Sequence, residues 1–138
     1  MSWSMLMYRN HWAFAHDVQQ DAFMESAARY VAAAPKYSAV PWLLQWREFW
    51  LYSAGNQGNG ASCIGADEFL TDDGRVEDFR EFLRDYRSWL AAGADDEHAA
   101  AGLNTVSLIA YAETADAVLT GDESHPNVHR TQEAEAAP

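Results

Sequence analysis

Residues 41–54 read PWLLQWREFWLYSA, and a helix built from them is apolar on almost every side. Proline stands at its first position and glycine stands just past its end, as is common at helix termini. Three tryptophans share one face at helical spacing: Trp42, Trp46 and Trp50. A helix that is apolar all round lies in the middle of a protein or against a partner. We therefore predict that this stretch forms the central helix.

Apolar side chains recur at helical spacing in three further stretches. The pattern predicts helices from Asp17 to Ala34, from Arg75 to Ala92 and from Asn104 to Thr120. Asp17 is expected to cap the first of these helices, and Asp72 or Asp73 to lead into the second. Where the connections are short, antiparallel packing of neighbouring helices is expected, but the glycine-rich stretch of about 11 residues between the second and third helices is long for a bundle connection.

Two segments do not fit a helix as well. Residues 2–8 alternate, with Trp3, Met5 and Met7 on one side and serines opposite, although Leu6 and Tyr8 interrupt the polar side. The alternation fits a short strand, and a helical start fits equally well. Residues 55–65 hold four of the eight glycines, so this stretch interrupts the helices between the second and the third.

These features predict a mainly α fold. The expected architecture is a single-domain bundle of about four helices, with a glycine-rich interruption and a short N-terminal strand as one option. Residues 1–121 are expected to form the helical domain. Residues 122–138 lack apolar periodicity and are expected to form a mobile acidic tail.

The charge balance restricts the partners. The 138 residues carry 21 acidic and 9 basic side chains, which gives a formal net charge of −12. Such a chain is repelled by nucleic acid phosphates and by anionic membrane surfaces, and it is attracted to basic partners. The alternative is that the charge only keeps the protein soluble. The absence of a membrane-spanning or signal-like segment favours a cytoplasmic location, and the alanine- and arginine-rich composition favours a bacterial or phage source.

The motifs for metals, nucleotides and nucleophilic catalysis are incomplete. An EF-hand register built on Gly74 places Arg80 where calcium needs a carboxylate. The glycine-rich stretch has no lysine to hold a phosphate, and the histidines at 11 and 16, or at 125 and 129, are poorly placed for a shared metal ion. We therefore predict no cofactor, no metal site and no catalytic residues. An enzyme with an unrecognised site near Cys63 and the histidines remains an alternative.

The function that fits this profile is a non-enzymatic protein-binding module. Immunity proteins, antitoxins and phage-encoded inhibitors share this small, acidic, helical composition, which suggests docking onto a basic partner protein. An accessory or assembly subunit that uses its aromatic surplus as an interface is the alternative. Exposed carboxylates beside the glycine-rich stretch and after the third helix are the expected partner-binding residues: Asp67, Glu68, Asp72, Asp73, Asp95, Asp96 and Glu97.

Overall fold

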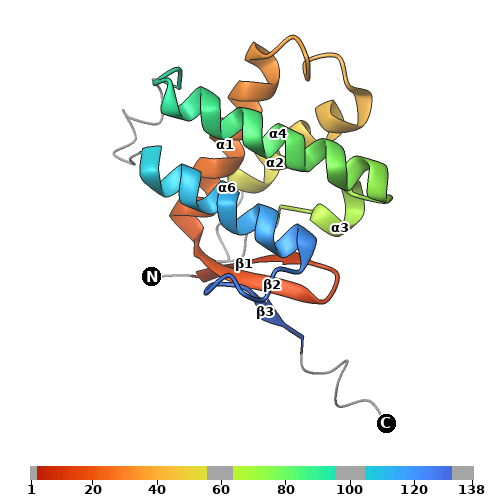
Figure 1. Ribbon diagram of the computed structural model, residues 1–138. Helices are drawn as coiled ribbons and strands as arrows, with labels where there is room; N and C mark the ends of the chain where they lie inside the picture. The colour runs from red at the N-terminus through yellow and green to blue at the C-terminus, as the bar shows by residue number, and fades with distance from the viewer. Residues whose placement is uncertain (1–2, 56–63, 96–104, 132–138) are drawn as a thin grey trace.

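The computed structural model describes residues 3–55, 64–95 and 105–131. Over these ranges the chain is mainly helical, as predicted, and it carries a small antiparallel sheet (Figure 1). The helices are α1 (Asp17–Ala33), α2 (Pro41–Gly55), α3 (Ala66–Phe69), α4 (Asp73–Ala91) and α6 (Thr105–Thr120). The strands are β1 (Trp3–Tyr8), β2 (His11–His16) and β3 (His129–Arg130). The long helices agree with the predicted ones, whereas α3, β2 and β3 were not predicted.

The sheet has the strand order β1-β2-β3, and β1 and β2 form a hairpin in which Leu6 lies opposite Ala13. Leu6 and Tyr8 are buried, while Met5 and Met7 are exposed. The N-terminal strand is therefore present, but the side that the sequence suggested to be polar is the side that faces the core. The reason is that α6 packs on this side of β1 and β2, so the residues that interrupted the polar pattern are the ones that contact the helices.

Helix α6 joins the sheet to the rest of the protein. It contacts β1 and β2 on one side and α1 and α4 on the other. Helix α1 continues directly from β2 and packs mainly against α2. In Figure 1 the hairpin lies below α6, and α4 lies above it.

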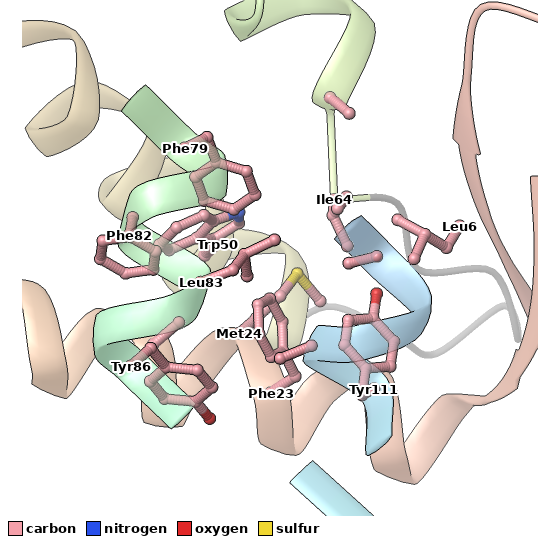
Figure 2. Packing of buried hydrophobic residues seen from close by; sticks show 14 of the residues in the cluster. Leu6, Phe23, Met24, Trp50, Ile64, Phe79, Phe82, Leu83, Tyr86 and Tyr111 are labelled. Carbon is pink, nitrogen blue, oxygen red and sulfur yellow. The ribbon is translucent and has the colours of Figure 1, made fainter. Parts of the chain in front are cut away.

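The core is rich in aromatic rings, and α2 supplies its largest side chains. Trp46 and Trp50 are completely buried, as expected for a central helix, whereas Trp42 is only partly buried. The indole nitrogen of Trp46 donates a hydrogen bond to the backbone oxygen of Ile64. Figure 2 shows Trp50 among the α4 side chains Phe79, Phe82 and Leu83. The α2 tryptophans thus connect α4 to the segment that follows residue 63.

The helix ends agree with the sequence in part. Asp72 caps α4 by accepting a hydrogen bond from the backbone nitrogen of Arg75 at 2.9 Å. Gly121 follows α6 with a φ of 67°, a conformation that glycine adopts at little cost. Asp17 does not cap α1, contrary to the prediction. It is the first residue of that helix, is buried, and accepts a hydrogen bond from the Ser4 hydroxyl of β1.

The segment after α6 does not leave the fold at residue 121. Strand β3 pairs with β2, and Val128 is buried. The His129 ring stacks on Trp12 at a centroid distance of 4.6 Å, and the backbone nitrogen of Thr131 donates to the oxygen of Asn10 at 2.7 Å. The expected mobile tail over residues 122–138 is therefore wrong for residues 122–131, because a strand pair and one buried valine anchor them. Residues 132–138 lie outside the described part of the chain.

Candidate functional site

The four carboxylates beside the glycine-rich stretch are all on the surface. Asp67 and Glu68 lie on α3, Asp72 precedes α4, and Asp73 is its first residue. All four are exposed. They are close in the chain because α3 ends only a few residues before α4 begins. We refer to Asp67, Glu68, Asp72 and Asp73 as the acidic set.

Arg9 of the β1–β2 turn contacts two members of the acidic set. The backbone nitrogen of Arg9 donates to Asp67 at 3.0 Å, and its guanidinium lies 3.8 Å from Asp73. The guanidinium also lies over the Tyr8 ring, 5.0 Å from its centroid. Arg9 adopts a φ of 54°, which costs free energy for a residue other than glycine. The contacts with Asp67 and Asp73 hold the hairpin turn against the helices.

An apolar groove borders the acidic set. It has a volume of about 200 Å³ and lies between Met5 and Met7 of β1 and residues 64–68. Both methionines are 39% exposed, while Ile64 and Ala66 form a buried floor. Asp67 and Glu68 line the same groove, so acidic and apolar groups share one surface. We refer to this region, together with the acidic set, as the acidic groove.

The local sequence explains why this groove exists. Gly65 adopts a φ of 75° at the start of α3, and a Cβ atom there would lie 2.9 Å from the Phe49 ring. Glycine therefore allows the chain to turn closely over α2 and enter α3 beside β1. Tertiary packing adds the second wall, because Leu6 faces the core and its neighbours Met5 and Met7 must then face outward.

The second predicted acidic site is different. Asp95 is only 3% exposed, and its carboxylate accepts hydrogen bonds from Ser26 and from the Arg29 guanidinium at 2.9 and 3.0 Å. The Tyr86 hydroxyl donates to Ser26, and burial raises the pKa of Tyr86 above its ordinary value. Asp95 thus ties the end of α4 to α1 and is not an exposed contact residue. Asp96 and Glu97 lie outside the described residues.

The histidines within the described ranges do not converge. The His11 ring lies 3.4 Å from Glu123, His16 precedes α1, and His125 accepts a hydrogen bond from the backbone of Asn127. In the part of the chain that the structure describes, no three histidine, aspartate or glutamate side chains are grouped so that they can hold a metal ion. Cys63 and His98 lie outside that part, so the alternative enzymatic site near Cys63 has no described geometry.

Sequence reasoning missed the methionine wall of the groove. The signal was the pair of alternating stretches on either side of Arg9 and Asn10, since two such stretches separated by two residues indicate a hairpin. Residues 11–16 read HWAFAH, in which the alanines are small enough to lie under a helix. A hairpin would have placed Met5 and Met7 on the same face as the larger aromatic residues of β2.

Comparisons with protein-family models, with curated proteins and with solved structures find no match for this chain. Among the described residues, no helix combines the length and the apolar character needed to cross a lipid bilayer.

Proposed function

We propose that this chain is a non-enzymatic protein-binding module that docks onto a basic partner protein through the acidic groove. The observation that supports the proposal is the combination of two exposed methionines with Asp67 and Glu68 around one apolar depression. Methionine adapts its shape to an apolar side chain of a partner. Carboxylates around such a contact attract a basic surface and orient it.

The balance of charge around the groove supports a basic partner. The Arg9 guanidinium lies 3.8 Å from a fully solvated Asp73 carboxylate, which is a weak pairing. Among the described residues, the four carboxylates outnumber the two arginines beside them, Arg9 and Arg75, so the surface is negative. An inhibitor or immunity-type protein acting in the cytoplasm would use such a surface to cover a basic cleft of its target.

A short peptide of alternating lysine and leucine is a suitable probe, and the corresponding peptide of glutamate and leucine is its control. We expect the lysine peptide to shift the methyl NMR signals of Met5 and Met7 in a saturable way, and the glutamate peptide to leave them unchanged. The variant Asp67→Asn/Glu68→Gln should weaken binding roughly tenfold, which corresponds to about 1.4 kcal/mol.

A matched variant distinguishes binding at this site from attraction to the overall net charge. Glu25→Gln/Glu113→Gln removes the same number of charges from exposed positions on α1 and α6. It should leave the affinity for the lysine peptide within roughly a factor of two. Equal weakening by both variants, or binding that leaves the methionine signals unchanged, would show that the peptide responds only to net charge.

The second candidate function is an accessory subunit of a larger complex, and one feature of α2 favours it. Leu44 and Leu51 lie seven residues apart on this helix and are 37% and 41% exposed, and the neighbouring Tyr52 is 70% exposed. This stripe lies on the helix that was expected to be apolar all round. If it is a subunit interface, Leu44→Glu/Leu51→Glu should raise the solubility of the isolated chain. An unchanged solubility would speak against this second candidate.

A further inference from the structure

A second pocket lies between α2 and α4, at the connection that joins α1 to α2. Its volume is about 210 Å³, which is smaller than the roughly 300 Å³ at which pockets begin to hold drug-sized ligands. Tyr37, Leu43, Phe79 and Phe82 line it and are buried. The pocket therefore has a mostly apolar and aromatic floor, and its size fits a single long side chain.

The aromatic side chains around this pocket already contact cations of the chain itself. The Arg75 guanidinium lies over the Trp42 ring at 5.1 Å from its centroid, and the Lys36 ammonium lies over the Tyr37 ring at 5.4 Å. Trp42, Tyr37 and Lys36 all line the pocket. Rings in this position attract positive charge through their π faces.

The positive charge of Lys36 is compensated within the chain. Its ammonium lies 3.0 Å from Asp85 and 3.3 Å from Glu81, and the Tyr37 hydroxyl donates a hydrogen bond to Asp85. Burial acts to raise the pKa of Asp85, but the hydrogen bonds from Tyr37 and Lys36 outweigh it and hold the pKa below its ordinary value. Asp85 is therefore ionised at neutral pH and holds Lys36 at the edge of the pocket.

Asp78 supplies a second carboxylate to the pocket. It is exposed on α4 and lies three residues before Glu81, so both side chains project from the same side of the helix. Among the described residues, no lysine or arginine forms an ion pair with Asp78. Asp78 thus adds a negative charge that no described lysine or arginine compensates at the mouth of an apolar pocket.

We propose that this pocket receives one arginine side chain of the partner protein, with its aliphatic stem on Leu43 and Phe79 and its guanidinium at Asp78 and Glu81. Arginine suits the pocket better than lysine because its planar guanidinium can contact two carboxylates at once and stacks on aromatic rings. The inference rests on the proposed function, since a basic protein partner supplies the arginine. It adds an anchoring contact that is separate from the acidic groove.

The test uses blocked arginine, N-acetyl-arginine amide, and its neutral analogue N-acetyl-citrulline amide. Citrulline has nearly the same shape but lacks the positive charge. We expect blocked arginine to shift the NMR signals of the Trp42 indole and the Leu43 methyl groups in a saturable way. Blocked citrulline should bind at least roughly fivefold more weakly, because charge-assisted contacts exceed neutral ones.

Two matched variants on α4 complete the test. Asp78→Asn should weaken the binding of blocked arginine roughly fivefold, while Glu77→Gln, which removes the same charge outside the pocket lining, should leave it unchanged. Both positions are exposed, so both variants are expected to fold. Absence of saturable shifts at Trp42, equal affinity for citrulline, or equal effects of the two variants would each overturn the inference.

This test is independent of the groove. The small probe does not span both sites, and Asp67→Asn/Glu68→Gln should leave its binding unchanged. If the lysine peptide does not bind at the groove but blocked arginine binds between α2 and α4, the proposed function is rejected and the arginine site in the second pocket is retained. If the lysine peptide binds at the groove but blocked arginine does not bind, only the arginine site in the second pocket is rejected.

Discussion

Two acidic segments of this chain look alike in the sequence and have opposite roles in the structure. The first contains Asp67 and Asp73, which are exposed and contact Arg9. The second contains Asp95, which is 3% exposed and is held by Ser26 and Arg29 of α1. The first segment spans α3 and the start of α4, the second follows α4, and both were expected to form a partner-binding surface.

The two segments differ in how closely an arginine from another element approaches the carboxylate. Arg29 contacts Asp95 with two nitrogen atoms, whereas the Arg9 guanidinium approaches Asp73 only to 3.8 Å. A buried carboxylate requires such partners, because an uncompensated buried charge is costly. Exposure and the absence of a close cation therefore distinguish a carboxylate that is available for recognition from one that holds the fold.

The largest expected effect comes from breaking the buried pair. Asp95→Asn keeps the shape of the side chain but removes the charge that compensates Arg29, and it should lower the free energy of unfolding by about 3 kcal/mol. Urea denaturation measures this value. Asp73→Asn is the matched control and should change it by less than about 0.5 kcal/mol. Similar losses for the two variants would remove the distinction between the two segments.

Residues 122–138 form a third acidic region, which can be compared with the two acidic segments above. Removal of residues 122–138 deletes β3 and the buried Val128, and we expect it to cost about 2 kcal/mol of stability. Removal of residues 132–138 alone should leave stability within about 0.5 kcal/mol, since it keeps these contacts. Thermal unfolding of both truncated chains gives the answer. Equal melting temperatures would mean that β3 and Val128 contribute nothing.

Asp85 is an intermediate case, because its side chain is partly exposed and contacts both Tyr37 and Lys36. Its pKa is lower in the folded protein than its ordinary value, so its stabilising effect is complete above that ordinary value and is lost as the pH falls through the folded pKa. We expect Asp85→Asn to destabilise the protein by about 1 kcal/mol or less at neutral pH. Below pH about 4 the free energy of unfolding of the variant should fall less than that of the wild type, because the variant has no carboxylate to protonate at this position. Urea denaturation as a function of pH tests this, and parallel curves for both proteins would contradict it.

The smallest effect on stability is expected at the start of α4. Asp72→Asn keeps a good helix cap, because asparagine accepts the hydrogen bond from Arg75 as aspartate does, and it should change stability by less than about 0.5 kcal/mol. Asp72→Ala removes the acceptor and should cost about 1 kcal/mol. If the asparagine variant lost as much as the alanine variant, the charge of Asp72 would be structural.

The sequence was sufficient for the helices, which depend on local periodicity, and for one of the two predicted caps. The apolar stripes of the long helices, a cap at Asp72 or Asp73 and the glycine after α6 were all visible in it. It was not sufficient where a distant element decides the environment. Arg29 lies 66 residues from Asp95, and the pairing of β3 with β2 joins the two ends of the chain. Nor could alternation alone tell which side of β1 faces α6, so the methionine wall of the groove was not predicted.

The central claim is that the acidic set serves recognition, and the salt dependence of association tests it most directly. The rate at which the lysine–leucine peptide binds is measured by stopped flow for the wild type, for Asp72→Asn/Asp73→Asn and for the control Glu25→Gln/Glu113→Gln. Electrostatic attraction fades as salt shortens the screening length from about 10 Å at 0.1 M to about 3 Å at 1 M. We predict that the wild type and the control associate quickly and slow steeply with salt, whereas Asp72→Asn/Asp73→Asn associates slowly with a flatter dependence. A wild-type rate that does not change with salt, or an Asp72→Asn/Asp73→Asn rate equal to that of the control, would contradict the claim.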